Sequence, residues 1–297
     1  DNLEIGTGAN SSDFGFNMVQ YNLTNNQKTF LTNAPTTQYA NIEDYGTAAI
    51  LMINPITEIL QNPSAPLGGT GTIRFDYYTS ADALIDWETI RLDDPNNGGF
   101  TYSNRGYAYN KIAYAGVFPA NLQGWSTKFN NNIADISYYT VVVQTFSLGF
   151  TLPISQTYRI NINCPTLKGF EPIRLTWLNQ WGAWDYYTFT MKSSKTISTK
   201  GSTYQQLAGS WNESAYRLDS FKGGKKAFRV NATEKITMNT DFVNESESEW
   251  FEELINSPEV YILEGYQSDD SNAALNNYVT PVRLTTSNYT KKTVAND

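Results

Sequence analysis

The chain has 297 residues, a net charge of −8, one cysteine and no histidine. Without histidine it lacks Ser-His-Asp and Cys-His nucleophiles and histidine-ligated zinc, and the lone Cys164 excludes an intrachain disulfide and any CxxC metal or redox motif. The acidic balance disfavours nucleic acid as a partner, and no apolar run approaches the roughly 18 residues of a membrane-spanning helix, so we expect no membrane partner either.

Aromatic residues are abundant, with 20 Tyr, 15 Phe and 7 Trp, while only 17% of residues are charged. Aromatic side chains favour pleated sheets, and the many asparagines favour turns. We therefore predict a mainly β chain, a β-dominated α+β fold with two β-sandwich or barrel-like domains. The same composition is typical of surfaces that partner proteins cover, although a large β core would explain it equally well.

Strand-like runs alternate with turn clusters through the N-terminal half. An Asp-Asn-Gly-rich stretch predicts a loop over residues 93–110. The sequence Asn163-Cys164-Pro165 interrupts the pattern, so we place a domain boundary there, between an N-terminal β domain of residues 1–165 and a C-terminal β domain of residues 166–297. We expect strands at residues 14–21, 48–53, 72–78, 138–146 and 158–162, and short helical pieces at residues 56–60 and 81–87.

Two apolar-aromatic runs around Asn179-Gln180-Trp181-Gly182 predict a β-hairpin over residues 173–191. Alternation along its second run gives the two faces of the hairpin different side chains. Both faces carry aromatic residues, so we expect both to be covered. One face has Trp184, Tyr186 and Thr188, and the other has Asp185, Tyr187 and Phe189. A second pair of β runs, at residues 227–230 and 235–239, follows the turn Gly223-Gly224.

One helix is predicted around residues 244–256. Its start is open between two capping boxes, Ser246 with Glu249 and Asn244 with Glu247. An apolar stripe that includes Trp250 continues the helix, and strands are expected after it at residues 260–263 and 278–284. The chain end, residues 289–297, reads as one arm of a hairpin whose partner strand comes from a further C-terminal segment or another subunit.

The sequence offers only weak candidates for a catalytic or metal-binding site. The oxygen-rich segments 93–99 and 269–272 are able to hold calcium, but the position of a closing glutamate is Asn104, so we read them as solvated loops. A glycosidase would need two carboxylates flanking a cleft, and the spacing of Asp185, Glu252 and Glu253 selects no pair. We therefore predict no catalytic, cofactor-binding or metal-binding residues, and no cofactor.

Charge is unevenly distributed along the C-terminal half. Residues 166–229 hold ten Lys and Arg against four Asp and Glu, whereas residues 230–297 hold four against twelve. Opposite patches on one subunit can join head-to-tail in a ring, where complementary charge sets the register. Alternatively, both stretches interleave in one domain and their charges cancel.

The segment Arg174-Leu175-Thr176-Trp177-Leu178-Asn179-Gln180-Trp181-Gly182-Ala183-Trp184-Asp185-Tyr186-Tyr187-Thr188-Phe189 resembles a segment of virion structural proteins of tailed bacteriophages. Residues 158–162, 239–241, 250–254, 257–261 and 279–282 fit the same pattern, so the likeness spans about residues 156–293. It implies a particle component without catalytic residues, in which Trp181, Trp184 and Tyr186 are core and turn determinants.

From the resemblance and the composition we expect a virion protein of the tail, baseplate or head–tail connecting region. Its partners would be other copies of itself and other virion proteins, in a ring or stack. Two alternatives stay open. The aromatic residues suit a carbohydrate-binding adhesin or fibre-associated module, and the carboxylates suit, less well, a glycosidase or depolymerase.

Overall fold

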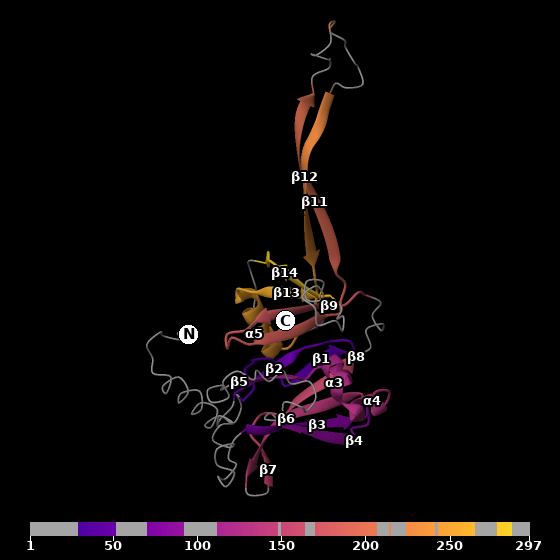
Figure 1. The fold of residues 1–297 in the computed structure, drawn as a ribbon, viewed down its shortest axis with the longest axis vertical. Helices are drawn as coiled ribbons and strands as arrows, with labels where there is room; N and C mark the ends of the chain where they lie inside the picture. Colours follow the sequence, from indigo (N-terminus) through magenta and orange to yellow (C-terminus); the bar gives the residue numbers. More distant parts are fainter. Residues whose placement is uncertain are drawn as a thin grey trace, which may run out of the picture. The chain divides into compact units, whose positions relative to one another are not determined.

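The computed structural model describes residues 29–51, 70–91, 112–147, 150–163, 170–206, 214, 224–240, 243–264 and 278–286 (Figure 1). Within them the protein is mainly β, as predicted. The chain divides into two compact units. We call Asp1–Thr190 with Thr240–Asp297 the body, and Met191–Asn239 the ribbon.

The largest sheet of the body has six strands in the order β1-β8-β6-β3-β4, with β7 also paired to β6. All its pairings are antiparallel except that of β1 with β8. Alternate residues of β3 enter the core, where Ile73, Phe75 and Tyr77 are fully buried. The strands are β1 (Thr37–Asn41), β3 (Thr70–Tyr78), β4 (Leu84–Arg91), β6 (Tyr138–Ser147), β7 (Phe150–Pro153) and β8 (Tyr158–Asn163).

Two short helices contribute to the same core, α3 (Pro119–Trp125) and α4 (Thr127–Asn132). Pro119 opens α3, where its missing N–H costs no hydrogen bond, and the Ser126 side chain caps α4 by accepting from the Phe129 amide at 2.9 Å. Leu122 and Phe129 are fully buried. A two-stranded antiparallel sheet, β2 (Thr47–Leu51) with β5 (Ile112–Gly116), adds Ile50 to this core.

The second body sheet has the order β10-β9-β13-β14. Its strands β9 (Ile173–Leu178) and β10 (Trp184–Phe189) confirm the predicted hairpin, while β13 (Val260–Leu263) and β14 (Val279–Val282) confirm the two later strands. At the hairpin turn the Asn179 side chain accepts from the amides of Trp181 and Ala183, both at 3.0 Å. Gly182 has φ of 73°, a conformation that favours glycine.

Helix α5 (Glu245–Asn256) confirms the predicted helix and decides its start. Asn244 is the N-cap: its side chain accepts from the Glu247 amide at 2.8 Å, and Glu247 accepts from the Asn244 amide at 2.8 Å. Of the two capping boxes, the one with Asn244 is therefore formed. The helix buries Trp250, Phe251 and Leu254.

Both faces of the 173–191 hairpin are covered, as expected. Helix α5 covers one face, where Tyr187 meets Phe251 with ring centroids 4.8 Å apart. On the other face Tyr186 meets Phe118, which precedes α3, at 5.5 Å. Trp184 packs against Tyr261 of the neighbouring β13 at 5.7 Å.

The helical piece expected at residues 81–87 is wrong. Thr79 Oγ1 accepts from the amides of Ala81 and Ala83 at 3.3 and 3.2 Å, Asp82 has φ of 58°, and the chain then enters β4. The local sequence suits a helix, but pairing of β4 with β3 along the sheet prevails over this preference.

The β structure predicted at 227–230 and 235–239 is confirmed as far as Thr237, but its division into two separate runs is wrong. They belong to one continuous strand, β12 (Gly224–Thr237), which pairs along its length with β11 (Ser194–Gln206), orange in Figure 1. The full length of β12 and the whole of β11 were not predicted, because neither face of the pair is buried and the hydrophobic alternation of a half-buried strand is therefore missing.

The other early strands are confirmed as β2, β3, β6 and β8. The strand expected at 14–21, the helical piece at 56–60, the loop at 93–110 and the arm at 289–297 lie outside the described residues. The domain boundary at residue 165 also falls outside them and stays a prediction. The elements on either side of that position pack together within the body, as Tyr186 does with Phe118.

Candidate functional site

The ribbon is exposed along both strands. Every residue of β11 and β12 is exposed except Gln206 and Ile236, which are half-buried. Three large apolar side chains are among the most exposed of the described residues, Ile197 at 67%, Phe228 at 78% and Val230 at 60%. A register shift between Ser202 and Thr203 leaves Phe228 without a residue opposite it in the ladder.

The register gives the ribbon two chemically different faces, because residues opposite one another in an antiparallel pair share a face. One, which we call the apolar face, carries the aliphatic side chains Ile197, Val230, Ala232 and Ile236 together with the charged Lys195, Lys225 and Glu234. The other, which we call the basic face, carries Lys200, Lys226, Arg229 and Lys235 among uncharged polar residues and Tyr204. Among the described ribbon residues, the basic face has no acidic side chain.

The excess of positive charge in the C-terminal half falls on the ribbon. The ribbon has nine Lys and Arg against three Asp and Glu, a net charge of +6. The body has twelve against twenty-six, a net charge of −14. Clustered positive charge on a strongly acidic chain makes the ribbon the candidate functional surface of this molecule.

A hollow of about 700 Å³ lies beside α5 on the body. Its acidic lining comes from Glu249, Glu252 and Glu253 of the helix. Glu253 accepts hydrogen bonds from Asn33 and, at 3.1 Å, from Gln180 Nε2, so it ties the hairpin turn and the N-terminal segment to α5. Leu178, Asn179, Trp250, Asn256, Ser257 and Pro258 complete the lining.

The carboxyl group of Asp185 lies buried on the β10 face that α5 covers. Trp250 Nε1 donates to Asp185 Oδ2 at 2.7 Å, and Thr32 and Asn179 also hydrogen-bond to this group. Burial raises the pKa of Asp185 to about 7, with a smaller contribution from the charge of Glu253. The polar neighbours satisfy the carboxyl group and hold three segments of the body together.

The structure therefore brings Asp185 and Glu253 near one another, but it does not present them as a pair across a cleft. Asp185 is only 5% exposed and lines a small, mostly apolar cavity of about 50 Å³, whereas Glu252 and Glu253 line the open hollow. Two glycosidase carboxylates would both have to reach the sugar bond. This geometry favours a structural role for Asp185.

A buried ion pair joins the segment after β1 to the 173–191 hairpin. Arg174 Nη1 lies 3.1 Å from Asp44 Oδ2 and donates to Thr188 Oγ1 at 2.8 Å, and Thr188 Oγ1 donates to Asp44 at 2.8 Å. Arg174 also donates to the Tyr45 carbonyl through Nε and Nη2. The network satisfies both charges in the interior.

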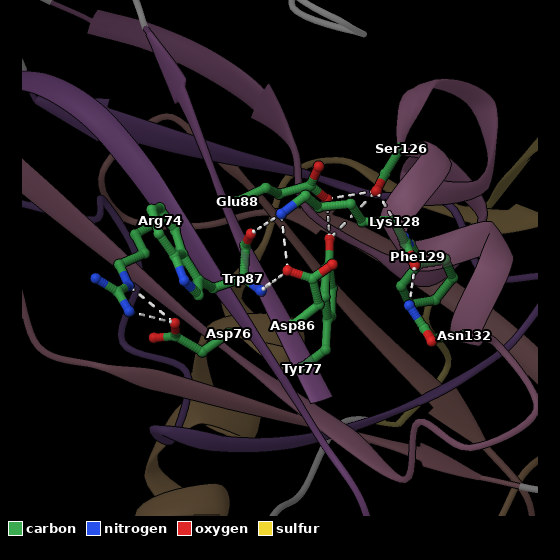
Figure 2. Close-up of polar contacts among 10 residues, drawn as sticks. All are labelled: Arg74, Asp76, Tyr77, Asp86, Trp87, Glu88, Ser126, Lys128, Phe129 and Asn132. Atoms are coloured by element: carbon green, nitrogen blue, oxygen red, sulfur yellow. Dashed lines mark hydrogen bonds and ion pairs between the residues drawn. The ribbon is translucent and has the colours of Figure 1, made fainter. Parts of the chain in front are cut away.

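Figure 2 shows a polar cluster on the edge strand β4 and helix α4. Glu88 accepts from the hydroxyls of Tyr77 and Ser126, and both burial and Glu88 raise the pKa of Tyr77. Nearby, Lys128 donates to Asp86 and to the Trp87 carbonyl, both at 2.7 Å. These contacts anchor α4 to the sheet.

Trp87 on β4 is an exposed aromatic side chain, 46% accessible. The guanidinium carbon of Arg74 lies 4.8 Å from its ring centroid and the Lys128 ammonium 5.6 Å. Arg74 is held in place by Asp76 at 2.8 Å. Cation–π contacts thus occupy the ring that a sugar would need for stacking.

The three hairpin aromatics are each half-buried and contact other residues of the body. Trp181 packs against the cluster of Leu31, Ala49, Leu51 and Ala183, and Trp184 contacts Tyr261. The Tyr186 hydroxyl lies 3.1 Å from Thr47 Oγ1.

The candidate calcium segments 93–99 and 269–272 lie outside the described residues. Within the described part of the chain, no group of three acidic, Cys or His side chains is placed to hold a metal ion, and no helix has the length and apolar character to cross a membrane. Sequence reasoning missed the ribbon surface. The signal present was the mixture of Lys, Thr, Ser and isolated β-branched residues at 194–206, which is typical of an exposed strand.

Comparison with known proteins finds no family model and no curated protein that matches this sequence.

Proposed function

We propose that this chain is a structural subunit of a tailed-phage particle, which acts by assembling with other virion proteins and has no catalytic step. The observation that carries the proposal is the ribbon, whose strands are exposed on both faces and carry Ile197, Phe228 and Val230 in solvent.

The energetics of the ribbon support an assembly role. A two-stranded β-ribbon is at best marginally stable in water, because it has no buried face. Exposed apolar side chains add an unfavourable contact with water, worth about 25 cal/mol per Å² of surface that a partner would cover. A partner that covers the apolar face would therefore order the ribbon and gain affinity from the same contact.

The likeness of residues 174–189 to tailed-phage virion proteins supports the choice of particle. These residues form the buried hairpin of the body, with Asp185, Thr188 and Phe189 all inaccessible. The likeness therefore falls on residues that maintain the fold, as we would expect of a structural subunit, and it requires no ligand.

The carbohydrate-binding alternative rests on Trp87, the most exposed tryptophan of the described residues. Because Arg74 and Lys128 already approach its ring, this side chain suits sugar stacking poorly. Binding of the purified chain to a glycan array, lost in Trp87→Ala, would favour this alternative over ours.

The test of the proposal uses particles of a phage whose genome encodes this chain. We expect the chain in mass spectra of gradient-purified particles, and gold-labelled antibody against it at a fixed position on the tail, baseplate or connector. Absence from washed particles, with the chain found only in the lysate, would contradict the proposal.

A further inference from the structure

Two surfaces of the described chain are complementary in charge and belong to different compact units. The basic face of the ribbon carries Lys200, Arg229 and Lys235 without an acidic neighbour on that face. The hollow beside α5 is lined by three glutamates, of which Glu249 and Glu252 are exposed. Lys200, Arg229 and Lys235 are exposed as well, so each surface has side chains that reach solvent.

The side chains on the basic face are well presented for such a contact. Lys200 and Lys235 stand on opposite strands of the same face, and Arg229 Nε donates to Asn231 at 2.9 Å, which orients its guanidinium along the strand. Lys and Arg carry flexible apolar stems that reach into a hollow while the charged end meets a carboxylate. A volume of about 700 Å³ is large enough for the ends of several such side chains.

We propose that the basic face of the ribbon of one copy docks into the glutamate-lined hollow beside α5 on the body of a second copy. The inference rests on the proposed structural function and names the partner as this same chain. Since the two contacting surfaces differ, the contact is head-to-tail, and its repetition generates a ring or an open stack.

The net charge of the chain argues against nucleic acid as the acidic partner of the ribbon. Proteins that bind phosphate backbones are usually basic, whereas this chain has a net charge of −8. A second copy carries the same net charge, so its attraction for the ribbon is local and comes from the glutamates that line the hollow.

The experiment is a charge swap in the full-length chain. The ribbon variant is Lys200→Glu/Arg229→Glu/Lys235→Glu, and the hollow variant is Glu249→Lys/Glu252→Lys. Sedimentation velocity at about 50 mM ionic strength, where screening is weak, measures self-association of each variant and of their equimolar mixture. The control Glu43→Lys/Glu264→Lys makes the same change of charge as the hollow variant at exposed positions outside the hollow.

We expect the wild type and the control to self-associate, and each swapped variant to associate at least about 100-fold more weakly, because like charges would then face one another. The mixture should recover most of the wild-type affinity, since both contacts between unlike variants are complementary: the native ribbon with the native hollow, and the acidic ribbon with the basic hollow. Recovery also shows that both variants are folded, which circular dichroism would verify independently.

Three results would overturn the inference: swapped variants that associate like the wild type, a mixture that stays dissociated, or a wild type that is monomeric at every concentration. Retention of the wild type, but not the ribbon variant, on double-stranded DNA would make nucleic acid the partner and would also overturn it. None of these results would contradict the proposal that the chain is a virion subunit, because that proposal is tested by particle composition and antibody labelling. The two proposals can therefore fail independently.

Discussion

At the scale of single residues, the most costly side chain to remove is Asp44. Asp44→Ala would leave the guanidinium of Arg174 buried without its counter-charge, and we expect a loss of about 3–5 kcal/mol in the free energy of unfolding. Urea denaturation followed by tryptophan fluorescence measures it. The matched control is Asp86→Ala, which breaks the exposed pair with Lys128 and should cost much less. Equal losses for the two variants would show that the buried pair adds nothing.

Asp185 makes stability depend on pH. Because burial raises its folded-state pKa to about 7, the folded protein holds this proton in a range where the unfolded chain, with a pKa near 3.9, has lost it. Its contribution is fully present below about pH 4 and is lost as the pH rises through 7. Asp185→Asn keeps a neutral group there and should gain stability relative to the wild type by about 3 kcal/mol between pH 5 and pH 8.

The measurement compares urea midpoints of the wild type and Asp185→Asn at several pH values from 5 to 8. Only the difference between the two proteins is diagnostic, since other carboxylates titrate in both. Curves that stay parallel across this range would mean that Asp185 ionises normally. Glu253, whose charge contributes to the shift, provides a second check, because Glu253→Gln should lower the pKa of Asp185.

At the scale of elements, the two rival starts of α5 offer a direct comparison. Asn244→Ala removes the side chain that accepts from the Glu247 amide, and we expect a loss of about 1 kcal/mol. Ser246→Ala removes only a hydroxyl that donates to Asn244, and should cost less than half as much. Thermal or urea unfolding of both variants measures the difference, and the opposite order would place the cap at Ser246.

The elements that the sequence predicted are those with a buried face. The hairpin at 173–191, the helix after Asn244 and the strands at 72–78 and 138–146 all alternate or repeat apolar residues against a core. The predictions were wrong or incomplete where no buried face produces this pattern. Residues 84–87 belong to β4 because they pair with β3, and the strands β11 and β12 have no buried residue. The candidate site lies on β11 and β12, which have no buried face, so the hydrophobic pattern that located the core could not predict the site.

The sequence showed that charge is unevenly distributed, but it did not show on which part of the fold the positive charge lies. A division at residue 230 cut through β12, whereas the structure assigns residues 191–239 to one unit and so concentrates the excess of Lys and Arg on the ribbon. The pairing of β11 with β12, two segments separated in sequence by residues 207–223, brings scattered lysines together on one basic face. The basic face could be recognised only from the register of the β11–β12 pair.

At the scale of the whole molecule, the division into two compact units predicts that the body folds without the ribbon. Ser194 pairs with Thr237, and Asn239 donates to the Lys192 carbonyl at 2.7 Å, so the two ends of the ribbon lie close together. A short Gly-Ser turn replacing residues 191–239 should join them without strain, because closing a short flexible loop costs little. Among the residues that the structure describes, the buried core of the body, which includes Ile73, Phe75 and Trp177, contains none from the excised segment.

We expect this deletion variant to unfold cooperatively at nearly the wild-type urea midpoint, read from tryptophan fluorescence, because six of the seven tryptophans lie in the body. The same protein should lose self-association, since it retains the acidic hollow but no longer carries the basic face. A deletion variant that fails to fold would make the ribbon part of the fold of the body. A deletion variant that folds and still self-associates would show that the copies contact one another through another surface of the body.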